Sequence, residues 1–242
     1  MTDNLKSKQL PLFSQKKGLN WLIIAAIITV VLWQLPAGHY ILYPFSILAT
    51  WFHEMGHGLI ALLFGGKFDQ LILFPDGSGL ALHSTPVKLS AAGRASIAAG
   101  GPLGPPIAGA LFILAGRHYK TAHYGLILLG VLLIVSVLIW VRSAFGIVVI
   151  SALSIVILGM AFKAEAWLQT FTIQFLGVQA CVSTYHQIDY LFIYSVTIDS
   201  QQMLSDTGHI AEQMWLPYWF WGIVIILISL AMLFLSLRLA YR

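Results

Sequence analysis

Long apolar runs separated by short polar segments dominate this chain. Stretches of about 20 apolar residues match the thickness of the hydrocarbon layer of a bilayer. By this pattern we expect membrane helices near residues 20–35, 40–64, 89–115, 124–141, 144–162, 167–184 and 218–239. The fourth and fifth runs adjoin so closely at Arg142 that their boundary is open. The pattern predicts an all-α polytopic membrane protein with six or seven transmembrane helices.

A polar interval after the second run has a different pattern. Two short extended-type runs, 68–74 and 79–83, flank Pro75-Asp76-Gly77-Ser78-Gly79, which is typical turn sequence. We therefore expect a short β-hairpin directly after the second helix. Its edge, near Leu71 and Leu73, could accept an extended peptide as an added strand; the alternative is a simple connector.

The third run contains Gly100-Gly101-Pro102-Leu103-Gly104-Pro105-Pro106, which we expect to interrupt the helix. Broken backbone at membrane depth persists only when it is buried in protein or lines a wet cavity. The alternative is close helix packing, which small residues allow. In either case we expect Gly101 and Gly104 near the functional centre, as candidate substrate-binding positions.

Composition supports the membrane class and bears on topology. The 242 residues are 59% hydrophobic and 9% charged, which excludes an ordinary soluble domain. The net charge of +4 arises from few residues, several of them in a polar tail at residues 1–19, so it indicates orientation and no nucleic-acid partner. Residues 20–242 form one expected membrane-embedded domain, with the N-terminus cytoplasmic and the second helix ending on that same side.

The second run carries His53-Glu54-Met55-Gly56-His57. On a helix the two histidines lie one turn apart on nearly one face, so both can bind one zinc ion. Glu54 lies beside them and could take a proton from water. The alternative is a hydrogen-bonded His/Glu cluster that joins helices, but charged groups within a membrane are costly and usually functional.

A catalytic zinc site usually has three protein ligands, so one ligand must come from elsewhere in the chain. Asp206, shortly before the last run, is the first candidate, and Asp189 is the alternative third ligand. Asp199 and His209 are weaker candidates.

These motifs together resemble the site-2 protease class of intramembrane zinc metalloproteases, in particular its small branch without a PDZ insertion. The similarity rests on four elements in order: the histidine motif, the turn at 75–79, the Gly/Pro segment at 99–105, and Ser205-Asp206. It implies zinc held by His53, His57 and a later carboxylate, with Glu54 as base. The Leu-Asp-Gly setting of the wider class is missing here, and the Ser-Asp step of the small branch points to Asp206.

The sequence thus predicts a zinc-dependent endopeptidase, with one Zn²⁺ per chain, that cleaves membrane proteins or transmembrane peptides within or next to the bilayer. A membrane regulator could control access. A di-iron oxidase would need about eight histidines in several clusters. A transporter, or a non-catalytic relative that binds membrane proteins, is the remaining alternative.

Overall fold

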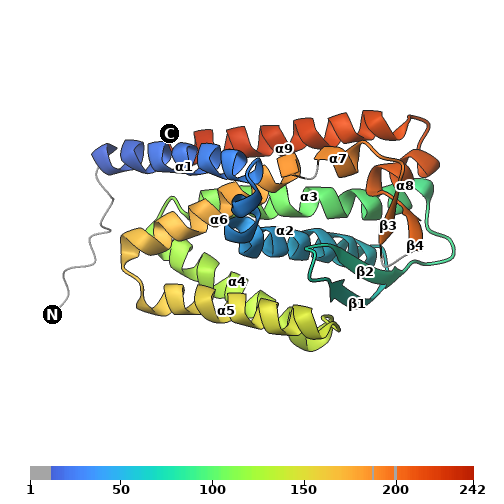
Figure 1. Cartoon of the computed structure of the whole chain (residues 1–242), viewed down its shortest axis with the longest axis horizontal. Helices are drawn as coiled ribbons and strands as arrows, with labels where there is room; N and C mark the ends of the chain where they lie inside the picture. The colour runs from blue at the N-terminus through green and yellow to red at the C-terminus, as the bar shows by residue number, and fades with distance from the viewer. Residues whose placement is uncertain (1–11, 187, 199–200) are drawn as a thin grey trace.

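The computed structural model describes residues 12–186, 188–198 and 201–242. Most helices run along one long axis, and two small strand pairs gather at one end (Figure 1). In chain order, the elements are α1 (Leu12–Trp33), α2 (Pro36–Leu63), β1 (Lys67–Leu73), β2 (Gly79–Ser84), α3 (Ala91–Ala115), α4 (Tyr119–Ile139), α5 (Ala144–Lys163), α6 (Ala166–His186), α7 (Ile188–Leu191), β3 (Ser195–Ile198), β4 (Gln201–Leu204), α8 (Asp206–Gln213) and α9 (Tyr218–Ala240).

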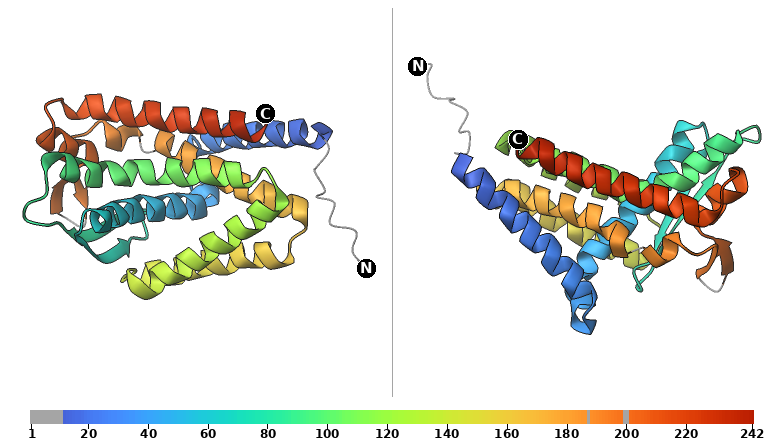
Figure 2. Two further views of the ribbon diagram at one scale, coloured as in Figure 1. Left: turned by 180° about the vertical axis from the view of Figure 1, so that it is seen from behind. Right: turned by 90° about the horizontal axis from the view of Figure 1, so that it is seen from above.

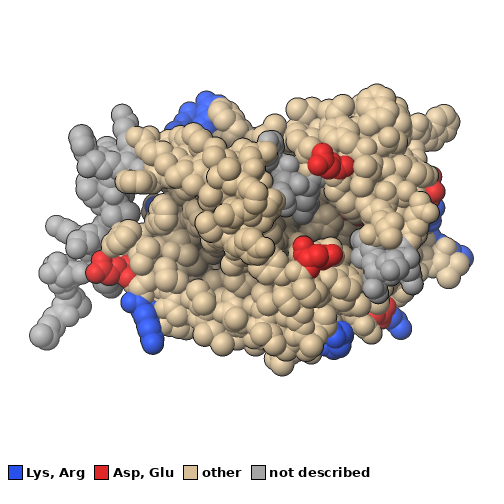
Figure 3. Space-filling model, viewed as in Figure 1, with Lys and Arg blue, Asp and Glu red and all other residues tan. Residues whose placement is uncertain are grey.

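Within the described part of the chain, four helices are long and apolar enough to cross a membrane: α3, α4, α5 and α9. On the face shown in Figure 3 most charged side chains lie toward the two ends of the molecule, apart from two acidic groups nearer its middle. This distribution agrees with an integral membrane protein, because hydrocarbon disfavours unpaired charge.

The first two helices do not form an antiparallel pair. They meet in a V, and α2 continues toward the end that carries the strands (Figure 2). Leu22 of α1 packs with Ile113 and Leu237, near the last turns of α3 and α9. The start of α1 therefore lies at the end opposite the hairpin, so the first residues of α1 do not share a side with the end of α2.

An antiparallel hairpin, β1–β2, follows α2 and lies along it. Its tip is held to α2, because Tyr43 Oη donates to the Pro75 carbonyl at 2.6 Å and Thr50 Oγ1 donates to the Gly77 carbonyl at 2.7 Å. On its outer side, Leu71 bonds through its backbone N–H and C=O to Trp140 and Arg142, between α4 and α5. The outer edge of β1 is therefore occupied at Leu71.

The prediction that the third helix is interrupted is wrong, because α3 is continuous through Pro102, Pro105 and Pro106. Close packing explains its glycines. A Cβ on Gly100 would lie 2.8 Å from the Gly56 carbonyl oxygen, and one on Gly104 would lie 2.4 Å from that of Phe52. Neighbouring helices thus support a segment in which the prolines remove backbone hydrogen bonds.

Helix α6 is joined to its neighbours by buried polar contacts. Gln179 Nε2 donates to Thr29 Oγ1 of α1 at 2.6 Å, and Gln174 Oε1 accepts from Tyr241, just after α9, at 2.7 Å. Gln169 Nε2 donates to the carbonyls of Ala161 and Ala164 at the end of α5. Such bonds stabilise helix association where apolar burial alone gives little driving force.

Candidate metal centre

Helix α2 presents two histidines to one point. His53 and His57 are 7% and 8% exposed, and their ring centroids lie 4.9 Å apart. His57 Nδ1 lies 2.9 Å from the Ile97 carbonyl of α3 and donates to it, because a carbonyl can only accept. This bond fixes the tautomer and leaves the Nε2 lone pair free to bind a metal.

The carboxylate of Asp206 faces this pair from the first turn of α8. Ser205 caps α8, with its Oγ accepting from Gly208 N at 3.0 Å, and its backbone N–H donates to the Tyr194 carbonyl. Thr207 Oγ1 donates to the Leu191 carbonyl at 3.1 Å. These bonds anchor the start of α8, so Asp206, 6% exposed, is held in place by its neighbours on both sides.

The three side chains are close enough to hold one metal ion. Asp206 Oδ2 lies 2.9 Å from His53 Nε2, and Oδ1 lies 3.2 Å from His57 Nε2. One ligand atom from each residue lies within 4.8 Å of the others. Two imidazoles and one buried carboxylate, whose Oδ2 has no hydrogen-bond partner of acceptable geometry among the described residues, fit a zinc site with three protein ligands and an open fourth position.

Gly101 of α3 lies directly against the two imidazoles. A Cβ at this position would lie 2.1 Å from His57 Nε2 and 2.7 Å from His53 Nε2. Both atoms are the ones that face Asp206. The missing side chain therefore leaves room for a ligand between the rings.

Glu54 lies beside the cluster, 7% exposed, and the hairpin approaches it closely. A Cβ on Gly79 would lie 2.7 Å from Glu54 Cγ and 2.9 Å from its Oε1. The backbone N–H of Ala81, in β2, also faces the Glu54 carboxylate. The carboxylate is thus placed between the histidine pair and the outer edge of β2.

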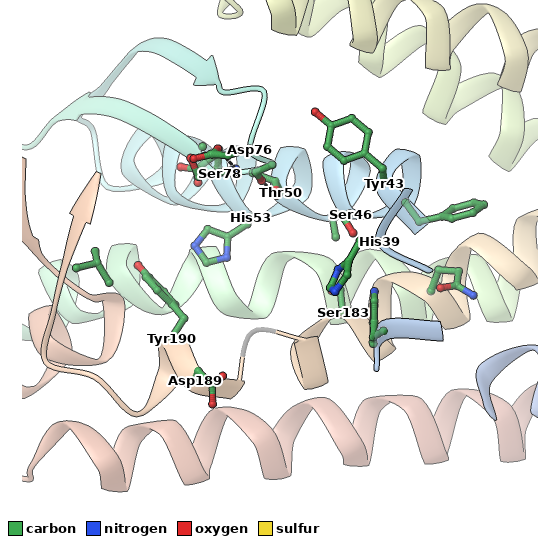
Figure 4. Close-up of a pocket in the computed structure, with 18 residues that line it drawn as sticks. His39, Tyr43, Ser46, Thr50, His53, Asp76, Ser78, Ser183, Asp189 and Tyr190 are labelled. Carbon is green, nitrogen blue, oxygen red and sulfur yellow. Dashed lines mark hydrogen bonds between the residues drawn. The ribbon is translucent and has the colours of Figure 1, made fainter. Parts of the chain in front are cut away.

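Two cavities meet at this centre. The larger, about 530 Å³, runs past the hairpin tip and has Thr50, Asp76 and Ser78 on one wall and Asp189 and Tyr190 on the opposite wall (Figure 4). The smaller, about 300 Å³, extends the other way among residues of β2, α3, β4 and α8. Acidic side chains border a hollow on this face (Figure 3). The centre is therefore reachable from two sides.

Asp76 and Ser78 form the hairpin tip within the larger cavity. The Asp76 carboxylate accepts from the Ser78 backbone N–H at 2.9 Å and from Ser78 Oγ at 2.7 Å. The side-chain and backbone hydrogen bonds from Ser78 hold the pKa of Asp76 below its ordinary value. The tip therefore carries a charged carboxylate at neutral pH.

The other candidate ligands do not join the cluster. Asp189 is exposed on the rim of the larger cavity, and His209 is exposed on the wall of the smaller one. Asp199 lies outside the described residues.

The four residues predicted to bind substrate are closely packed in this structure, and their role stays a prediction. The Leu71 and Leu73 side chains are 0% and 1% exposed and lie in the apolar core. Gly101 and Gly104 face α2.

Sequence reasoning missed Tyr190. This residue lines both cavities, and its ring centroid lies 6.2 Å from that of His53. The available signal was its position directly after Asp189 in a polar interval, a setting that aromatic residues also occupy at membrane interfaces.

Comparison with known proteins assigns the chain to a family. No curated protein and no solved structure matches the chain. The model of the Peptidase M50B-like family, which is the site-2 protease family, matches residues 21–236. Since this match covers most of the chain, the protein belongs to the Peptidase M50B-like family.

Proposed function

We propose that this protein is a zinc-dependent intramembrane endopeptidase that hydrolyses peptide bonds of membrane-protein substrates within or next to the bilayer. The observation that carries the proposal is the buried His53, His57 and Asp206 cluster, whose ligand atoms converge beside Glu54. Family membership supports the same activity. His53, His57 and Asp206 would hold one zinc per chain, and residues 20–242 would act as a single membrane-embedded domain.

Zinc held by these residues would polarise the scissile carbonyl as a Lewis acid and lower the pKa of the attacking water toward neutrality. Glu54 accepts a proton from the attacking water and later delivers it to the leaving amine. The His57 to Ile97 bond keeps the imidazole in the required tautomer. Burial of the centre excludes bulk water while the two cavities give access.

The hairpin offers a docking edge for the unwound substrate. Leu71 is opposite Ala81 and points its backbone groups away from β2, so Ala81 points its own groups away from β1. Residues Gly79 to Ala81 line the smaller cavity, next to Glu54. A substrate segment added to β2 would therefore place its backbone beside the catalytic carboxylate.

We further propose six membrane crossings, with α1 and α2 together forming the first and α3, α4, α5, α6 and α9 the others. Basic residues favour a cytoplasmic N-terminus. Because α1 begins opposite the hairpin, Arg117, Lys120, Lys163 and Arg238 share its side, and the metal centre lies toward the other face. Labelling of single cysteines introduced at residues 88 and 117 from each side of sealed vesicles tests this orientation.

The central experiment is cleavage of reporter transmembrane peptides by purified protein, with and without a chelator. Activity should require about one zinc per chain, and Glu54→Gln should abolish turnover while zinc stays bound. Wild-type protein that binds such peptides without cutting them would instead support the non-catalytic alternative. Cleavage by Glu54→Gln at the wild-type rate would disprove the assigned base.

A further inference from the structure

Tyr190 occupies the point where the two cavities meet. The residues that line both cavities are His53, Glu54, Gly79 and Tyr190. Of these, His53 is a proposed metal ligand, Glu54 is the proposed base, and Gly79 is the hairpin residue that packs against Glu54. Tyr190 is the remaining polar side chain at the junction, and it lines both cavities together with Glu54.

The phenol of Tyr190 points into the metal centre. Its hydroxyl lies next to Asp206, and its ring meets that of His53 edge to face at 74°, with the centroids 6.2 Å apart. Because the O–H bond can rotate, its hydrogen can point to a substrate atom.

Hydrolysis at this centre needs a donor that the zinc-binding set does not provide. Attack of water on the carbonyl carbon moves an electron pair onto the carbonyl oxygen, which becomes negative. Ionised Glu54 and Asp206 can only accept hydrogen bonds, and His57 Nδ1 already donates to Ile97. His53 also lines both cavities, but its Nδ1 lies across the ring from the Nε2 that faces Asp206, so the phenol is the side-chain group placed to donate to that oxygen.

We infer that Tyr190 is a catalytic residue, whose hydroxyl donates a hydrogen bond to the carbonyl oxygen of the scissile bond as that oxygen gains negative charge. The inference rests on the proposed function and adds a residue to it. No proton leaves the phenol. The proton lost by water goes to Glu54 and then to the departing nitrogen, the electron pair returns from oxygen to carbon, and the C–N bond breaks.

A tyrosine phenol ordinarily titrates at a pKa of about 10, so it is protonated at neutral pH. A neutral hydroxyl is the form that can donate.

The test is Tyr190→Phe, which removes one oxygen and keeps the ring. With a transmembrane reporter peptide that the wild type cleaves, kcat should fall by roughly 100-fold or more, with KM within about twofold, because one oxyanion donor typically contributes this much. Zinc content and melting temperature should match those of the wild type. Tyr194→Phe is the control, since the Tyr194 hydroxyl is exposed and donates to Glu212.

A second measurement does not depend on turnover. In a Glu54→Gln background, a peptidyl phosphinate that mimics the tetrahedral intermediate should bind more weakly after Tyr190→Phe, while the parent peptide should bind equally well. If the phenylalanine variant does not fold, Tyr190→Met supplies apolar volume without a hydroxyl.

The outcomes separate this inference from the proposed function. Wild-type protein without zinc-dependent cleavage refutes the function itself. An active wild type together with an equally active Tyr190→Phe refutes the role of Tyr190 alone. Loss of zinc in the variant would also overturn it, since Tyr190 would then only position Asp206. His83, whose Nδ1 is buried and has no hydrogen-bond partner in the described part of the chain, is the rival donor. A fall in kcat for His83→Gln but not for Tyr190→Phe would transfer the role to His83.

Discussion

Replacing Gly101 with alanine tests the metal centre with a single methyl group. The added Cβ would lie 2.1 Å from His57 Nε2 and 2.7 Å from His53 Nε2. An ordinary contact begins near 3.4 Å, so His57 would have to move by about 1.3 Å, the difference between 3.4 and 2.1. The Ile97 bond opposes this movement. We expect zinc affinity to fall by at least 10–100-fold, as for a loss of ligand support, and kcat/KM by about 100-fold or more.

The assay is zinc content per chain after dialysis at defined free zinc, followed by cleavage of the reporter peptide. Gly159→Ala is the matched control, because a Cβ there meets nothing within 4 Å. Both replacements add the same methyl group to a helix, and alanine favours the helix over glycine by about 1 kcal/mol. If Gly101→Ala retains one zinc per chain and the wild-type rate, the histidine rings do not converge at that point and the proposed site is refuted.

Further predictions concern the third ligand and the hairpin. Asp206→Ala should remove zinc, whereas Asp189→Ala should leave the zinc content unchanged. Metal analysis of both proteins tests this, and zinc loss from Asp189→Ala alone would make Asp189 the third ligand. Gly79→Ala should displace the Glu54 carboxylate and lower kcat while zinc is retained, and an unchanged kcat would contradict the close approach of β2. The pKa of Asp76 is lower in the folded protein than in the unfolded chain, where it is about 3.9. Its hydrogen bonds therefore stabilise the fold fully above the unfolded pKa. That stability is lost as the pH falls through the lower pKa of the folded protein. Melting temperatures of the wild type and Asp76→Asn should therefore differ at pH 7 and converge in acid.

The membrane class and the histidine pair of α2 could be predicted because they depend on local pattern. Apolar run length and the four-residue spacing of His53 and His57 require no knowledge of distant contacts. Asp206 was preferred from its motif, and the structure brings it to the histidine pair.

Other features depend on contacts far apart in the sequence. The three prolines of α3 predict a break when considered alone, and only packing against α2 keeps the helix continuous. The bond between Leu71 and the α4–α5 connection, which closes the outer edge of β1, joins segments about 70 residues apart. Tyr190 lies at the metal centre because of where α7 is placed, and the short sequence of α7 does not predict that placement.

The prolines of α3 also bear on how the protein is assembled. Pro102, Pro105 and Pro106 leave the carbonyls of Ala98, Gly101 and Pro102 without their usual intrahelical donors. Exposing such groups to lipid is costly, so this helix is a poor candidate for independent release from the translocon. It is expected to remain beside the insertion machinery until it packs against α2, which is made before it, and this links biogenesis of the span to formation of the catalytic pocket.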